Sequence, residues 1–446
     1  MAKLLRKSLT QIQHWQANNS FWYLLGGIML SVLLIAFIKN ETLILVALVA
    51  ITGIIGLWYY PEAGLAFTVN GVVTFAVVRD IIGLAAGQWV TLMVLAVFGL
   101  SLFIILIQDA QIINWRMIGK LMSLPLVFGV FLAISWLGSE NPAYGLVKLI
   151  RYGTIHLTVT LAAAFALTSR QRLRKVLRWL VILGLVLLIG SFFNLQMLTA
   201  HLGRLSIAED INPITFARSL GFGAIAALLF WGRSRNTNIS LILLLMVTTI
   251  SIILTGSRGP FLGFFFALVF FFLAWNRKPS RLIWAFLGLL ALIALVWIVM
   301  PPDFWGLRIV SLSASASIMQ RFTIWSTAIE LIAQSPFFGI GLGGYDAHIG
   351  FGVRWPHNII LEIWAEVGLP ALVLFVWFVF RAAVIGWRRR LNADHELRHL
   401  ISIFLALLVL TFVVAQFSGD ITFNYLIWFA ATVLQGVQYL EGKQDD

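Results

Sequence analysis

The side chains best suited to chemistry stand where a polar segment meets a long apolar run. His357 and Asn358 come directly before that run, which carries Glu362 and Glu366 one helical turn apart. A neutral histidine can accept a proton near physiological pH, and ionisable side chains at membrane depth are costly and usually functional. Ideal helical angles place both glutamates far round the helix from position 357. We therefore expect no simple His–Glu dyad unless His357 lies outside the helix. Asn358 is a good N-cap for that helix, and His357 could simply lie beside it.

Three arginines outside this segment are candidates for binding an anion. Arg204 and Arg258 follow glycine-containing turns, and Arg321 precedes Trp325 by one helical turn. The planar guanidinium group suits phosphate and carboxylate, and Arg258 stands near the start of a helix opened by Pro260, where free N–H groups also attract anions. The alternative is that these side chains only reach lipid phosphate. Each arginine alone is a weak indication, and together they favour an anion site.

The glycine-rich stretch 339–344 resembles a phosphate-binding loop in composition only. No predicted strand precedes it, which the dinucleotide-binding and P-loop motifs require. We interpret it as a tight turn.

These residues must be positioned by membrane helices. The chain has 446 residues, of which 61% are hydrophobic and 11% charged, against about 25% charged in soluble domains. Apolar runs of about 20 residues without period-2 alternation predict an all-α polytopic membrane protein with about 12–14 transmembrane helices in a single integral membrane domain, 1–446. The predicted helices are 22–38, 42–59, 63–78, 89–107, 117–137, 143–168, 176–194, 213–231, 239–255, 260–275, 282–299, 358–380, 399–418 and 421–440. We expect Gly368 and Pro370 to interrupt the helix at 358–380.

The distribution of basic residues predicts orientation. Most of the 31 Lys and Arg fall in loops on the same side as the N-terminus, which places both termini in the cytoplasm. The net charge of +13 is thereby explained without a nucleic-acid partner. A minority, mostly Arg, falls on the outer side. The large outer loop, 300–356, contains an amphipathic stretch at 318–334 that predicts a helix lying on the membrane surface.

Several stretches together resemble the O-antigen ligase and O-antigen polymerase family. They are Arg321-x-x-x-Trp325, Pro336-x-x-Gly-x-Gly-x-Gly-Gly-Tyr345, Pro356-His-Asn-x-x-Leu-Glu-x-x-x-Glu-x-Gly368, Thr255-x-Ser-Arg-Gly-x-x-x-Gly263 and the segment from Arg204 to Pro213. The resemblance covers roughly 200–370. As a set these motifs are fairly specific, although no single one is.

The resemblance implies a glycosyltransferase of the periplasmic face of the bacterial inner membrane. It would move a glycan from undecaprenyl diphosphate to a hydroxyl of the lipid A core, with inversion and without nucleotide sugar, essential metal or other cofactor. His357 would be the base or a positioning residue for the acceptor hydroxyl. Arg204, Arg258 and Arg321 would hold the donor diphosphate, with Asn358 and Glu366 as further substrate-binding candidates.

Two alternatives remain from the sequence. A polymerase would use the same donor site, with a second lipid-linked glycan as acceptor. A secondary transporter is less well supported, because the exceptional charges gather on one face and no internal repeat is found. Whether Glu362 and Glu366 are catalytic or structural is also open; a structural Glu366 would pair with an arginine of a neighbouring helix.

Overall fold

The computed structural model describes residues 42–82, 89–193, 205–206, 211–275, 312–349 and 354–440, and all regular structure in these ranges is helical. Nine segments within them are long and apolar enough to cross a membrane. They are Thr91–Ile112, Trp115–Leu137, Pro142–Ala166, Arg170–Phe192, Pro213–Phe230, Arg235–Leu254, Arg258–Trp275, Leu369–Asn392 and His395–Ala415. The predicted all-α polytopic membrane fold is confirmed.

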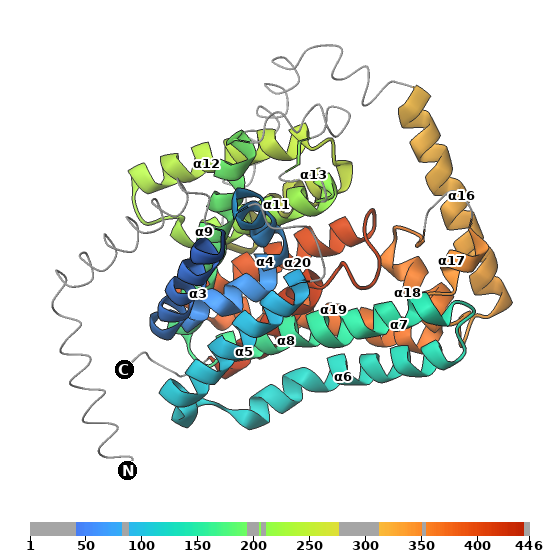
Figure 1. Ribbon diagram of the computed structural model, residues 1–446, viewed down its shortest axis with the longest axis horizontal. Coiled ribbons are helices and arrows are strands. Elements are labelled where there is room, and N and C mark those ends of the chain that lie inside the picture. The colour runs from blue at the N-terminus through green and yellow to red at the C-terminus, as the bar shows by residue number, and fades with distance from the viewer. Residues whose placement is uncertain are drawn as a thin grey trace.

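Figure 1 shows the described helices in chain order. The α-helices are α3 (Thr42–Tyr59), α4 (Pro61–Ile82), α5 (Trp89–Asp109), α6 (Trp115–Leu137), α7 (Pro142–Arg151), α8 (Leu157–Ala166), α9 (Arg170–Phe193), α11 (Pro213–Ala227), α12 (Arg235–Leu254), α13 (Arg258–Trp275), α16 (Leu312–Gln334), α17 (Tyr345–His348), α18 (Ile359–Val367), α19 (Leu369–Asn392), α20 (His395–Ala415) and α21 (Leu426–Gly436). Short 3₁₀ turns cover Ala110–Ile112, Leu228–Phe230 and Val437–Tyr439, and a π-helical turn covers Tyr152–His156.

Most predicted helices are present, with informative differences. The range predicted at 143–168 is α7 and α8 joined by the π-helical turn. The range predicted at 358–380 is divided at Gly368, as expected, into α18 and α19. The last helix begins at Leu426, after a turn, and not at 421. The predicted helices 22–38 and 282–299 lie outside the described residues.

Among the nine apolar spans in the described ranges, α11 and α20 are the most deeply buried. Other parts of the chain bury 83% of the apolar stretch of α11 and 78% of that of α20, against 28–50% in the other spans. The α13 helix packs along α20, and α9 packs along α11. The outer helices leave large apolar side chains uncovered, such as Ile134 and Leu243, which suits a surface facing lipid.

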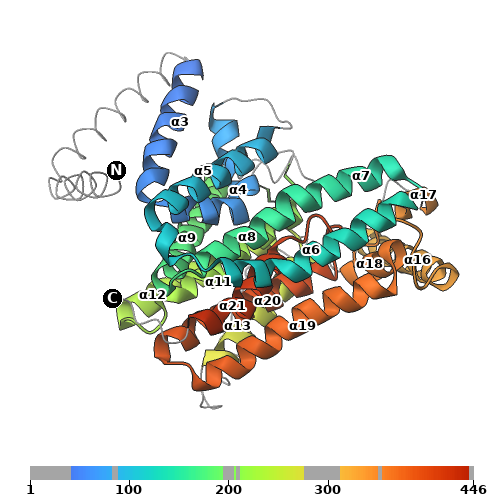
Figure 2. The same ribbon diagram turned by 90° about the horizontal axis from the view of Figure 1, so that it is seen from below.

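One end of the molecule gathers the elements that carry the candidate site. In both views α16, α17 and α18 lie at the same end, beside the turn between α6 and α7 (Figures 1 and 2). The α16 helix begins at Leu312, earlier than the predicted 318, and it packs against α18. Ile324, Ala328 and Leu331 form its buried face, whereas Phe322 and Ile329 are left uncovered by the protein.

Candidate functional site

The predicted start of the helix after His357 is confirmed. The side-chain oxygen of Asn358 accepts hydrogen bonds from the backbone N–H groups of Ile360 and Leu361, at 3.0 and 3.1 Å. This is the N-cap arrangement, and it begins α18 at Ile359. His357 therefore lies outside the helix.

His357 is held in an unusual backbone conformation by two tryptophans. Its φ is +56°, and among the described residues no other non-glycine residue has a positive φ. The indole N–H of Trp355 donates to Nδ1 of His357 at 3.0 Å, and the indole N–H of Trp325, from α16, donates to the carbonyl of Pro356 at 3.0 Å. Strained backbone of this kind persists where its surroundings fix it, and it clusters at functional sites.

The structure brings three of the predicted site residues within electrostatic reach of one another. Burial, and then the positive charge of Arg321, lower the pKa of His357 to about 4, which the charge of Asp420 partly opposes. Burial, and then the charge of Arg258, lower the pKa of Arg321. These groups come from the loop before α18, from α16 and from the first residue of α13. The imidazole of His357 is consequently neutral at physiological pH.

This arrangement can attract an anion. Arg258 is exposed and Arg321 is half-buried, and within the described part of the chain no carboxylate forms an ion pair with Arg321. Two guanidinium groups that raise each other's energy are relieved when an anion lies between them. Arg204, the third predicted ligand of the anion, lies outside the described residues.

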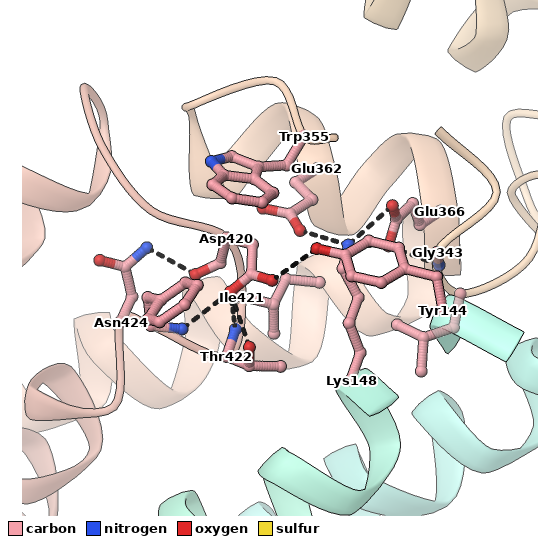
Figure 3. Close-up of polar contacts among 12 residues, drawn as sticks. Tyr144, Lys148, Gly343, Trp355, Glu362, Glu366, Asp420, Ile421, Thr422 and Asn424 are labelled. Atoms are coloured by element: carbon pink, nitrogen blue, oxygen red, sulfur yellow. Dashed lines mark hydrogen bonds and ion pairs between the residues drawn. The ribbon is translucent and has the colours of Figure 1, made fainter. Parts of the chain in front are cut away.

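Glu362 and Glu366 share a lysine that the sequence analysis did not pair with them. The ammonium nitrogen of Lys148, on α7, lies 2.7 Å from Oε1 of Glu362 and 2.8 and 2.7 Å from the two oxygens of Glu366 (Figure 3). All three side chains are completely buried. The expected partner of Glu366 was an arginine of a neighbouring helix, which is wrong: the cation that reaches its carboxylate is Lys148 of α7. A lysine inside an apolar run, facing two acids one turn apart, was the available signal.

Glu366 also fixes the glycine-rich turn. Its Oε2 accepts from the backbone N–H of Gly343 at 2.9 Å, and its backbone carbonyl accepts from Gly341 N–H at 3.0 Å and from the hydroxyl of Ser135 at 2.8 Å. With these contacts and the ion pair, both carboxylate oxygens are satisfied inside the protein. The turn is thereby attached to the end of α18.

A second buried acid, Asp420, organises the turn between α20 and α21. One of its oxygens accepts from the N–H and hydroxyl groups of Thr422 and from Phe423 N–H, all at 2.7–2.8 Å. The other accepts from the hydroxyl of Tyr144 at 3.2 Å (Figure 3). Tyr144 and Lys148 stand one turn apart on α7, so this helix connects the two acidic groups.

Two buried basic side chains, His156 and Arg218, also contact the turn between α20 and α21. Nε2 of His156, from the π-helical turn, lies 2.9 Å from the carbonyl oxygen of Ile421, and Arg218, from α11, donates to Asn424 at 3.3 Å. Sequence reasoning missed His156, because a lone histidine in an apolar run has no distinctive pattern. Arg218 belongs to the arginine-rich minority on the predicted outer side, and no separate role was predicted for it.

The segment that carries Arg258, Arg321 and His357 is similar to known proteins. The sequence model of the O-antigen ligase family matches residues 241–376, which contain Arg258, Arg321 and His357. The match covers less than a third of the chain, in the part that carries the candidate site. The resemblance found in the motifs is confirmed. The matched segment runs from within α12 to the first third of α19, so it includes the start of α13, the α16 helix and the loop before α18, which carry the three residues.

Two curated relatives agree with the ligase domain. The chain is 29% identical over 269 residues to an O-antigen ligase of Pseudomonas aeruginosa, which is 58% of this chain and 63% of the relative. It is 32% identical over 176 residues to a candidate polysaccharide ligase of Rickettsia conorii, which is 35% of this chain and 41% of the relative. The chain therefore matches less than two thirds of the length of each of these relatives.

Proposed function

We propose that this chain is a glycosyltransferase of the O-antigen ligase type. It would take a glycan from undecaprenyl diphosphate and attach it to a hydroxyl of the lipid A core, at the periplasmic face of the bacterial inner membrane. The observation that carries this proposal is the meeting of Arg258, Arg321 and a neutral His357 at one end of the bundle, inside the family domain. The distribution of Lys and Arg along the chain supports the orientation, with both termini cytoplasmic.

The chemistry of this donor agrees with a site built on arginines. Diphosphate is already a good leaving group, so the reaction needs its developing negative charge to be stabilised more than it needs an acid. Arg258 and Arg321 would supply that stabilisation in a partly dehydrated site, with Arg204 as a third predicted ligand. Direct displacement by the acceptor hydroxyl would invert the anomeric centre. We propose no nucleotide sugar and no essential metal for this step.

The other predicted site residues take roles consistent with their contacts. Asn358 would position His357, because its side-chain oxygen is already used to cap α18. Glu366 would act on the glycine-rich turn and not on the glycan, because its carboxylate is completely buried. His357 would take one of two roles, a base for the acceptor hydroxyl or a hydrogen-bonding group for the substrate.

The proposal is tested by glycan transfer with purified protein in proteoliposomes. The donor is a defined undecaprenyl-diphosphate glycan, and the acceptor is lipid A core. We expect Arg258→Ala, Arg321→Ala and His357→Ala each to reduce transfer by about 10²-fold, the loss seen when one charge-stabilising group is removed from a site of this kind. Wild-type rates in all three variants would remove the site assignment.

Arg235→Ala is the matched control. Arg235 is exposed at the first residue of α12, a 20-residue span that ends at Leu254, just before Arg258. It therefore lies at the opposite end of the span from the site, and its loss should leave transfer unchanged.

A wild-type protein that extends a second lipid-linked glycan, but leaves lipid A core unmodified, would identify a polymerase instead.

A further inference from the structure

The hydrogen bond between Trp355 and His357 restricts the protonation of the imidazole. An indole N–H can only donate, so the atom that receives it, Nδ1 of His357, must carry a lone pair and no proton. In a neutral imidazole the single proton then resides on Nε2. The structure thus selects one of the two neutral tautomers of His357.

The neutral state is the relevant one because of the charges around the ring. Burial and the charge of Arg321 keep the pKa of His357 at about 4, so an imidazolium is scarce at physiological pH. With Nδ1 occupied by Trp355 and Nε2 protonated, the ring has no free lone pair. It can take a proton from the substrate only by giving up the hydrogen bond from Trp355.

The position of Trp355 is set by the surrounding structure. Its half-buried ring packs near Phe423, with ring centroids 6.0 Å apart, and Phe423 belongs to the turn that Asp420 organises. The neighbouring Pro356 is held by Trp325. The positive φ of His357 turns its ring toward Trp355 within two residues of chain. The donor and acceptor of this bond are therefore fixed from several elements.

We propose that Trp355 is a positioning residue that holds His357 as the Nε2–H tautomer, so that His357 donates a hydrogen bond to the donor diphosphate and does not act as a base at Nε2. This inference rests on the proposed function, since the anion beside Arg258 and Arg321 is the diphosphate. An uncharged hydrogen-bond donor such as the Nε2–H group suits that place. It adds a hydrogen bond to the anion without adding a positive charge that the two arginines would repel.

This assignment determines the path of the proton. The acceptor oxygen forms a bond to the anomeric carbon while the bond from that carbon to the phosphate oxygen breaks. The bonding electron pair remains on the phosphate oxygen, and the hydroxyl proton passes to the departing diphosphate. His357 keeps its own proton throughout and stabilises the growing negative charge.

The tautomer is measured directly by nitrogen NMR of ¹⁵N-histidine-labelled protein in nanodiscs, with His357→Gln used to assign the signals. In the wild type at neutral pH we expect Nδ1 of His357 unprotonated and Nε2 protonated, with the Nε2 signal moving when inorganic diphosphate is added. In Trp355→Phe, which keeps an aromatic ring but removes the N–H, we expect a mixture of tautomers. Transfer should fall by about tenfold or more, as for a misdirected hydrogen bond to a charged group.

Trp325→Phe provides the matched control. It removes the other indole N–H that holds this loop, but that N–H contacts the Pro356 carbonyl and not the imidazole. We expect Trp325→Phe to keep the wild-type tautomer. The proposal is overturned if wild-type His357 carries its proton on Nδ1, or if Trp355→Phe keeps both the tautomer and the transfer rate. It is also overturned if inorganic diphosphate leaves the Nε2 signal unmoved. A wild type with the expected tautomer and diphosphate response, but without glycan transfer, contradicts the proposed function alone.

Discussion

Lys148 holds both carboxylate oxygens of Glu366, at 2.8 and 2.7 Å from its ammonium nitrogen, at a place with no exposed surface. The same nitrogen also pairs with Glu362. One cation therefore connects α7 to two turns of α18 and, through Glu366, to the glycine-rich turn at Gly343. The relationship joins elements that are more than 200 residues apart in the sequence.

Lys148→Met is expected to destabilise the protein by about 3–5 kcal/mol, because it leaves two carboxylates buried without their cation. Thermal unfolding in detergent measures this loss. In the variant that also carries Glu362→Gln and Glu366→Gln, no buried charge remains, and part of the stability should return. Lys148→Met with wild-type stability would show that the ion pairs contribute nothing to the fold.

Gly368→Ala is expected to disrupt the junction between α18 and α19. Gly368 has φ +93°, and a Cβ there would lie 2.1 Å from the carbonyl oxygen of Phe337. Both the backbone conformation and the space therefore require glycine. We expect a clearly lower unfolding temperature. Gly119→Ala is the control, because a Cβ at Gly119 in α6 meets nothing within 4 Å. Equal unfolding temperatures for the two variants would contradict this explanation of the break.

Much of the fold could be predicted from the sequence, because lipid forces membrane-crossing segments to be continuous apolar helices. The break at Gly368 and the cap at Asn358 also follow from local chemistry. The π-helical turn at Tyr152–His156 could not be predicted, since it depends on contacts between helices and not on the composition of the turn.

The candidate site was predictable in part. Types and spacing pointed to Arg258, Arg321 and His357, and helical angles argued against a His–Glu dyad; the structure gives His357 a tryptophan partner instead. The pairing of Lys148 with Glu366 could not be derived, because it depends on which helices are neighbours. A lysine inside an apolar run and two acids one turn apart indicate that each needs a buried partner, but a single sequence does not show that residues 148 and 366 are close.

Arg321→Gln is expected to raise the pKa of His357 from about 4 toward 6.5. Histidine is charged when protonated, so removing a nearby positive charge makes protonation easier; burial remains and keeps the pKa below 6.5. The Trp355 bond would then be lost at higher pH than in the wild type, because a proton on Nδ1 excludes it. A pH titration of labelled His357 by NMR measures the shift.

Arg354→Gln is the control for that titration. Arg354 is an exposed arginine in the same loop, three residues before His357, and its charge does not contribute to the lowered pKa. Its loss should leave the midpoint of the His357 titration, and so the pKa of His357, unchanged. If Arg354→Gln shifted the midpoint as far as Arg321→Gln, the effect would be one of total charge and not of the site.

Tyr144→Phe is expected to cost about 1.5–3 kcal/mol of stability, because the hydroxyl of Tyr144 donates to a buried carboxylate, that of Asp420. Tyr345→Phe removes another buried hydroxyl, which donates to the neutral backbone carbonyl of Ile324 at 2.7 Å, and should cost only about 0.5–1.5 kcal/mol. Chemical denaturation of the two variants under identical conditions measures the difference. If Tyr345→Phe were the more destabilising, the hydroxyl of Tyr144 would not be what holds α7 to the turn between α20 and α21, and Asp420 would be fixed by its own turn alone.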